Sequence, residues 1–204
     1  MNVSPDPPDT PDTSPCGPRR GDARVGHVFL DAPTIAARVR ELGAEISRDY
    51  EGRELLLVSI LKGGVIFMAD LARSIDLKVE MDFLAISSYL QEHRDAGKKA
   101  IRFFKDLDQP IKDKDVLVVQ DIVDTGLTLH YILRSLSLRR PGSLEVCTLL
   151  DRPQQRLVDI DVRYHGFNVP DDFVVGYGFD HRQAFRNMPY LAFLEVEPNL
   201  PGLF

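Results

Sequence analysis

The sequence predicts an α/β fold in which a central parallel sheet is flanked by helices. Short aliphatic runs, of which residues 116–119 are the clearest, suit strands that are buried on both faces of such a sheet. These runs alternate with segments whose apolar residues recur at the period of a helix. Because strands that alternate with helices form parallel sheets covered on both faces, the alternation predicts this architecture. The length of 204 residues fits one domain, which can bury a core without a disulfide or a metal.

The predicted elements follow one another in a regular order, with the ordered body beginning near Val28. The predicted helices cover residues 33–48, 65–73 and 125–138, and the predicted strands cover residues 55–61, 78–87, 101–104, 116–119, 144–150, 162–164, 173–175 and 190–195. Pro141 and Gly142 end the third helix. The strand at 101–104 is short and is expected to pair in a hairpin. Ligands of such sheets bind at the carboxyl ends of the strands, so the residues that follow each strand are the candidates for function.

The first 22 residues differ in composition from the rest of the chain. They hold six of the fourteen prolines, and Asp, Ser, Thr and Gly fill most of the remainder. Such a segment buries too little apolar surface to offset the entropy lost on ordering. We therefore expect a disordered tail over residues 1–22, with a partner-binding arm as the alternative, and a single domain over residues 23–204.

Composition limits the classes of function. The formal net charge of −6 argues against a protein that wraps nucleic acid, which needs a basic face. The two cysteines, Cys16 and Cys147, form no disulfide framework, as expected of a reduced compartment. No run of 18 apolar residues predicts a membrane helix, and no secretory signal is visible. We expect a cytoplasmic protein that works without a membrane or a nucleic acid.

The segment that follows the strand at 116–119 combines the groups of an anion site. Asp121, Asp124, Thr125, Gly126 and Thr128 occupy a predicted turn from strand to helix. The first N–H groups of a helix have no partner within the helix and lie at the positive end of its dipole, so they attract phosphate. The carboxylates instead suit sugar hydroxyls, a magnesium ion or a proton from a base. In the alternative interpretation an Asp and a Thr only cap the helix, but the buried strand directly before the turn favours the anion site.

This segment, residues 115–129, resembles the phosphoribosyl pyrophosphate signature of the type I phosphoribosyltransferases, and most closely that of the hypoxanthine-guanine branch. Other segments resemble the same branch in order along the chain: residues 61–64 its pyrophosphate loop, 87–89 the start of its mobile lid, 105–108 the segment after the lid, and 173–180 with 186–190 its purine-binding hood and metal segment. The resemblance extends from about residue 27 to residue 196. It implies the family fold, with a small hood built mainly from the C-terminal segment.

The resemblance implies a reaction and roles for the residues of the turn. In this family N9 of a 6-oxopurine displaces pyrophosphate from C1 of phosphoribosyl pyrophosphate, which gives IMP or GMP, and Mg²⁺ is the cofactor. Asp124 is then the candidate general base at purine N7. The 5′-phosphate is expected at Thr125, Gly126, Leu127 and Thr128, through their backbone N–H groups and the threonine hydroxyls.

Further residues receive implied roles from the other segments. The sugar hydroxyls are expected at Gln120 and Asp121, magnesium at Asp180 and Asp121, and pyrophosphate at Arg186 and at Lys62 and Gly63, where the family often has a non-proline cis peptide. The purine is expected to stack on Phe173, with its edge at the Val174 backbone and its 6-oxygen at Arg152. Ser88 and Tyr89 are expected to close over the site and exclude water.

Three positions depart from the family pattern, one of them Leu90, where the lid often has Gly, which suggests a stiffer lid. Gln120 stands where the family has Glu, which removes one negative charge near the sugar and predicts a weaker interaction with metal-bound substrate. Arg152 stands where the family has Lys, and its planar fork has a different reach, so the preference among hypoxanthine, guanine and xanthine stays open. A regulator that binds the same ligands with little catalysis is the alternative function, although such a protein has no need of Asp124.

Other classes of phosphate-handling protein do not fit the sequence. The chain has no Gly-x-x-x-x-Gly-Lys-[Ser/Thr] motif, which excludes a P-loop kinase or NTPase. Residues 176–178 lack the third glycine of a dinucleotide-binding turn. The family resemblance further suggests a homodimer or homotetramer.

Overall fold

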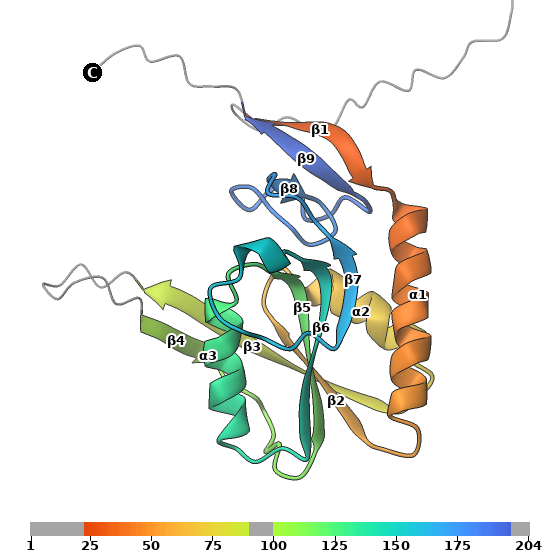
Figure 1. Ribbon diagram of the computed structural model, residues 1–204, viewed down its shortest axis with the longest axis vertical. Helices are drawn as coiled ribbons and strands as arrows, with labels where there is room; N and C mark the ends of the chain where they lie inside the picture. The colour runs from red at the N-terminus through yellow and green to blue at the C-terminus, as the bar shows by residue number, and fades with distance from the viewer. Residues whose placement is uncertain (1–22, 90–99, 197–204) are drawn as a thin grey trace, which may run out of the picture.

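The computed structural model describes residues 23–89 and 100–196, which form two sheets (Figure 1). The tail predicted over residues 1–22 lies outside the described residues, as do residues 90–99, which follow the predicted start of the lid, and residues 197–204. The strands are β1 (Ala23–Leu30), β2 (Leu55–Ile60), β3 (Val79–Tyr89), β4 (Ala100–Lys105), β5 (Asp115–Val123), β6 (Ser143–Asp151), β7 (Tyr164–Asn168), β8 (Val174–Val175) and β9 (Leu191–Val196). The helices are α1 (Ala32–Asp49), α2 (Val65–Ser74) and α3 (Leu127–Ser137), with a short 3₁₀ helix, η1, at Pro153–Gln155.

The larger sheet has the strand order β4-β3-β2-β5-β6-β7. All neighbours in it are parallel except β4, which pairs antiparallel with β3 as the predicted hairpin. Alternate residues of β2 enter different clusters: Leu55 and Leu57 pack with α1 and α2, whereas Leu56 and Val58 pack with α3. The sheet is therefore buried on both faces, and the predicted α/β architecture is confirmed.

A second sheet of order β1-β9-β8 forms the hood, which Figure 1 shows beyond the end of β7. The expectation of a hood mainly from the C-terminal segment is incomplete, because β1 supplies one strand and pairs antiparallel with β9. The ordered body consequently begins before Val28. The register of β1 shifts between Val25 and Val28 and again before Leu30, so its side chains do not keep the strict alternation that reveals a strand in a sequence.

Most other boundaries also differ from the predicted ones by one or more residues, and three of these differences have a visible cause or consequence. Helix α1 begins at Ala32, one residue early, because the Asp31 carboxylate caps it by accepting the N–H of Thr34 at 2.8 Å. Strand β7 begins at Tyr164, where the predicted strand ends. Strand β5 continues through polar residues as far as Val123, because its ladder with β6 runs on to Asp151. No helix in the described part of the chain is long and apolar enough to span a membrane.

A buried carboxylate in β3 anchors the segment that follows β4. Asp82 accepts the N–H groups of Phe83 and Asp108, each at 2.7 Å, and the ammonium group of Lys105 at 3.1 Å. Burial acts to raise the pKa of Asp82, but these donors outweigh it and the pKa lies below its ordinary value. The charged form of Asp82 therefore stabilises the fold.

We expect Asp82→Asn to lower the free energy of unfolding at pH 7 by about 2 kcal/mol, the scale for a buried hydrogen-bonded charge. Since the folded pKa is depressed, this contribution is complete above the ordinary Asp pKa of about 3.9 and is lost as pH falls through the folded pKa. Urea unfolding at pH 7 and pH 3 measures the difference. Asp108→Asn is the matched control, because its exposed carboxylate binds the same Lys105 and contributes little. Equal stability of Asp82→Asn and wild type at pH 7 would contradict the prediction.

Candidate active site

The predicted anion turn lies at the carboxyl end of β5 and leads into α3. A cavity of about 280 Å³ opens here, lined by residues that include Gln120, Asp124, Thr125, Gly126 and Thr128. Gly126 has φ +79°, and an added Cβ would lie 2.8 Å from Cδ1 of Ile160. The turn therefore requires glycine at this position.

Two kinds of unsatisfied polar group face this cavity or border it. Within the described residues, the backbone N–H groups of residues 125–128 donate to no backbone or side-chain acceptor. The Oδ1 atom of Asp124 is buried and likewise has no hydrogen-bond partner among the described residues. Buried polar groups are nearly always paired in native proteins. The site thus presents donors for an anion and, beside them, an acceptor for a donor group of a ligand.

The structure separates Gln120 from Asp121, which the sequence placed together at the sugar. Gln120 lines the cavity with Asp124, whereas Asp121 points to the other face of β5, because successive residues of a strand alternate. Oδ2 of Asp121 lies only 1.7 Å from where a Cβ on Gly63 would be. Burial raises the pKa of Asp121 against the opposing effects of the Ile122 N–H and of Arg186.

The segment at 61–64 connects β2 to α2 and lies between Asp121 and the hood. Its Leu61–Lys62 peptide is cis, as the family resemblance implies. The Lys62 ammonium donates to Oε1 of Gln183 at 3.1 Å. On the hood side, a Cβ on Gly178 would lie 2.2 Å from the carbonyl oxygen of Gly63. Residues 61–64 thus lie between β5 on one side and the hood on the other.

Two predicted site residues of opposite charge, Asp180 and Arg186, lie side by side in the hood. Arg186 pairs with Asp180, with 2.5 Å between Nη2 and Oδ1, and donates from Nη1 to the Gly178 carbonyl at 2.7 Å. The second Asp180 oxygen accepts the N–H of Gln183 at 2.7 Å. Among the described residues no group of three or more His, Cys, Asp or Glu side chains could hold a metal.

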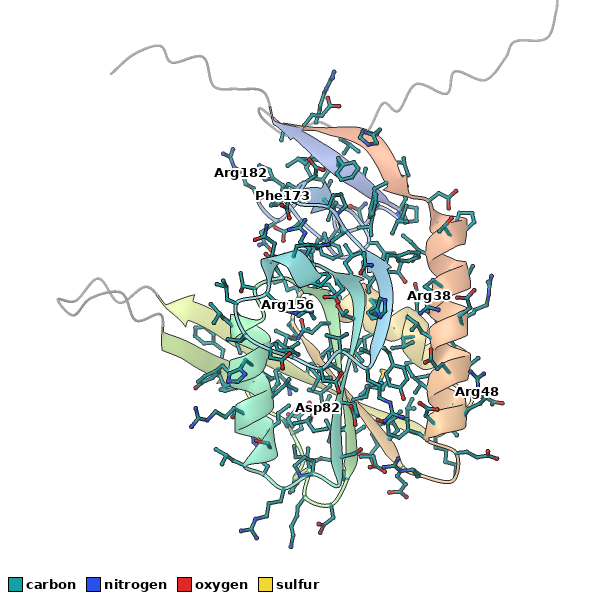
Figure 2. The ribbon with its side chains drawn as sticks, viewed as in Figure 1. Arg38, Arg48, Asp82, Arg156, Phe173 and Arg182 are labelled. Atoms are coloured by element: carbon teal, nitrogen blue, oxygen red, sulfur yellow. The ribbon has the colours of Figure 1, made fainter. Side chains whose placement is uncertain are left out.

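An exposed aromatic ring and an arginine occupy the other end of the hood. The Phe173 side chain is 55% exposed, and its ring meets the ring of His181 edge-on at 5.9 Å between centroids. Arg152 donates from Nη2 to the Asp172 carbonyl at 2.6 Å, while its buried Nε has no partner among the described residues. Val174 is buried in β8. Figure 2 shows Phe173 on the hood, on the side of the molecule away from α1.

Comparison with known proteins identifies the family. The model of the phosphoribosyl transferase domain matches residues 28–182. The chain belongs to the phosphoribosyltransferase family. It is 47% identical over 177 residues to the hypoxanthine-guanine phosphoribosyltransferase of Mycobacterium avium, covering 84% of this chain and 86% of that protein. A Staphylococcus aureus enzyme of the same name is 44% identical over 170 residues, covering 83% and 94%.

Solved structures agree with the phosphoribosyltransferase fold. A hypoxanthine-guanine phosphoribosyltransferase from Bacillus anthracis superposes with a TM-score of 0.79 at 37% identity, covering 85% of this chain and 99% of that one. A hypoxanthine phosphoribosyltransferase from Trypanosoma cruzi, in a ternary complex with substrates, gives 0.77 at 33% identity, covering 84% and 96%. The family and the fold predicted from the sequence are both confirmed.

Two of the predicted site residues of this phosphoribosyltransferase lie at the edge of the described part of the chain. Ser88 and Tyr89 end β3, and their backbones pair with Ile101 and Ala100 of β4. The chain between these two strands, where the lid is expected, lies outside the described residues.

The structure also adds a residue that the sequence did not single out. Arg156 donates from Nη1 to the carbonyl oxygen of Asp124 at 2.8 Å, and from Nη2 to the carboxylate of Asp151. Contacts of a side chain with a distant backbone carbonyl leave no pattern in a sequence, so no signal for Arg156 was available. Arg156 therefore contacts the backbone of the phosphoribosyltransferase signature, residues 115–129, at Asp124.

Proposed function

We propose that this protein is a hypoxanthine-guanine phosphoribosyltransferase of purine salvage. It transfers the phosphoribosyl group of 5-phosphoribosyl 1-pyrophosphate to N9 of hypoxanthine or guanine and releases pyrophosphate, giving IMP or GMP. The observation that carries this proposal is the buried Oδ1 of Asp124, which has no partner among the described residues, beside the N–H groups of residues 125–128, which donate to no acceptor there. The names of the relatives support the same reaction.

The turn after β5 binds the sugar phosphate in this proposal. The 5′-phosphate accepts the N–H groups of residues 125–128 and the hydroxyls of Thr125 and Thr128, at the positive end of the α3 dipole. Gln120, which lines the same cavity, donates to a ribose hydroxyl. This arrangement fixes C1 of the ribose next to the purine site, and such positioning supplies much of the rate when pyrophosphate leaves from an oxocarbenium-like carbon.

Asp124 is the proposed proton acceptor. As N9 of the purine forms its bond to C1, the bond between C1 and the pyrophosphate oxygen breaks, and the proton on N7 passes to Asp124. Its buried Oδ1 has no partner among the described residues, so it is free to accept this hydrogen bond. Lys62, Gly63 and Arg186 bind the pyrophosphate that leaves.

Asp121 and Asp180 are the proposed magnesium ligands. Burial raises the pKa of Asp121, and the nearby charge of Asp180 raises it further. A cation relieves the cost of burying the Asp121 carboxylate beside that charge. Magnesium usually takes one or two protein carboxylates and completes its shell with substrate phosphates and water, so these residues fit a Mg²⁺ that arrives with the substrate. When bound, Mg²⁺ supplies neutralisation of the charge on the pyrophosphate.

The hood and the lid complete the proposed site. The purine stacks on Phe173, its edge meets the Val174 backbone, and its 6-oxygen accepts from Arg152, whose buried Nε is unpaired within the described residues. Ser88 and Tyr89 close over the reacting atoms and exclude water. We further propose that the enzyme is cytosolic and works as a homodimer or homotetramer.

Turnover with magnesium and phosphoribosyl pyrophosphate tests the function. Hypoxanthine, guanine, xanthine and adenine are each supplied, and pyrophosphate release and nucleotide formation are measured. Formation of IMP or GMP, with no AMP, is the expected result. Binding of GMP without turnover of any base would favour the regulator, and neither binding nor turnover would reject the function itself.

The amide at Gln120 leads to a separate prediction, about how the rate depends on the Mg²⁺ concentration. The amide leaves one negative charge fewer beside the metal-bound sugar than the Glu of the family pattern. We therefore expect Gln120→Glu to reach half-maximal rate at a lower Mg²⁺ concentration than wild type, while both remain active. Initial rates across a magnesium titration at saturating substrate measure this shift. Superimposable titration curves would show that the charge at position 120 has no part in metal binding.

A further inference from the structure

The residues after β6 contact the back of the phosphate turn through three consecutive carbonyl groups. The Val123 carbonyl accepts the N–H of Arg152 at 3.0 Å, and the Thr125 carbonyl accepts the N–H of Leu157 at 3.0 Å. Between them, the Asp124 carbonyl accepts Nη1 of Arg156 at 2.8 Å. Two backbone donors and one side-chain donor of residues 152–157 thus satisfy every carbonyl from 123 to 125.

These bonds set the direction of the N–H groups that face the phosphate site. In a trans peptide the carbonyl and the following N–H point in opposite directions, and the cis peptide found in the described residues is at Leu61–Lys62, away from this turn. Because the carbonyls of residues 123–125 point toward residues 152–157, the N–H groups of residues 124–126 point away from them, toward the cavity that these residues line. Two of these groups, those of Thr125 and Gly126, belong to the proposed phosphate site. Successive N–H groups that converge in this way form an anion-binding nest.

Arg156 is the one side chain among the three donors, and it is held firmly. Its side chain is 16% exposed, and the Asp151 carboxylate that binds its Nη2 is 13% exposed. Asp151 is the last residue of β6 and pairs with Val123 in the ladder. The planar fork of the guanidinium thereby ties the middle carbonyl of the turn to the end of the neighbouring strand. Figure 2 shows Arg156 below the hood, on the same side of the molecule as Phe173.

We propose that Arg156 is a positioning residue, which holds the turn in the conformation that binds the 5′-phosphate. It touches neither the phosphate nor the purine in this proposal and acts through the Asp124 carbonyl. The inference rests on the proposed function, since it assigns the phosphate to this turn. It predicts a selective loss: binding of the sugar phosphate weakens without Arg156, whereas binding of the base, which the hood provides, does not.

Steady-state kinetics of Arg156→Met test this selectivity. We expect the KM for phosphoribosyl pyrophosphate to rise about 10-fold, which corresponds to about 1.4 kcal/mol, and the KM for hypoxanthine to stay within about 2-fold of wild type, the usual scatter for uncoupled sites. Calorimetry with GMP gives a second readout that needs no turnover, and its Kd is expected to rise by about the same 10-fold. Arg156→Lys keeps one donor group without the fork, and its effect is expected to be intermediate.

Arg53→Met is the matched control, because Arg53 contacts the end of β5 that lies opposite the phosphate turn. Arg53 makes two hydrogen bonds to the carboxylate of Asp115, the first residue of β5. Its loss removes an arginine–aspartate ion pair far from the turn and should leave both KM values unchanged.

The possible results distinguish failure of the positioning role of Arg156 from failure of the proposed function on which it rests. Inactive wild type that fails to bind GMP rejects the proposed function. With wild type active or GMP-binding, equal GMP affinity and equal KM for phosphoribosyl pyrophosphate in Arg156→Met reject the positioning role, and so does an equal rise in both KM values, which indicates a general structural defect. Where Arg156→Met does not fold, wild-type values for Arg156→Lys reject it.

Discussion

Asp124→Asn is expected to lower kcat by at least 10-fold, and by about 10²-fold if Asp124 supplies the full effect typical of a general base. The amide has the same shape as the carboxylate and still lines the cavity, but it no longer accepts a proton at neutral pH. The KM for phosphoribosyl pyrophosphate should change little, because the proposal assigns the 5′-phosphate to the N–H groups of residues 125–128. Initial rates with each substrate varied at saturating partner separate the two constants.

The stability of the same variant provides its control. Oδ1 of Asp124 is buried and has no hydrogen-bond partner among the described residues. A buried oxygen without a hydrogen-bond partner costs free energy, and costs more when its group is charged, so replacing the carboxylate with a neutral amide should leave the melting temperature unchanged or raise it. Residues placed for catalysis commonly lower stability in this way. An unchanged kcat would remove Asp124 from its role, and a lowered melting temperature would assign it to the fold.

Much of the fold around this site follows from local pattern. The aliphatic run at 116–119 predicts a strand buried on both faces, and the glycine and threonines that follow predict a turn into a helix. The structure has this arrangement in β5 and α3. The family resemblance and the fold it implied were also correct.

The remaining features depend on partners that are distant in the sequence. Strand β1 is stabilised by pairing with β9, more than 150 residues later, and its register shifts hide its alternation. The predicted strand ends at residue 119, so its alternation was not carried on to Gln120 and Asp121, which the ladder with β6 sends to opposite faces. The contact of Arg156 with the Asp124 carbonyl arises only once β6 and β5 lie side by side.

Gly63→Ala is expected to have the second large effect, through a clash at the proposed pyrophosphate loop. The new Cβ would lie 1.7 Å from Oδ2 of Asp121 and 2.8 Å from its Cγ. On its other side the loop approaches the backbone of Gly178 closely, since a Cβ added at Gly178 would lie 2.2 Å from the Gly63 carbonyl oxygen. Either the loop or the Asp121 side chain must therefore move. A displacement of about 1 Å among groups that position a substrate can cost about 10²-fold in rate, so we expect a loss of this size in kcat/KM for phosphoribosyl pyrophosphate.

A double-mutant cycle with Asp121→Ala tests whether this clash is the cause. The shorter side chain removes the atoms that the new Cβ would meet, so Gly63→Ala should cost little further activity in the Asp121→Ala background. Gly52→Ala is the control for loss of a glycine away from the site: Gly52 has a positive φ, +74°, which Gly63 does not have, and a Cβ there meets nothing within 4 Å. That variant should lose stability and keep its kcat/KM. Equal, additive losses from Gly63→Ala in both backgrounds would place the cause in the loop backbone itself, and wild-type kcat/KM would show that the enclosure of this loop by Asp121 and the hood does not matter for catalysis.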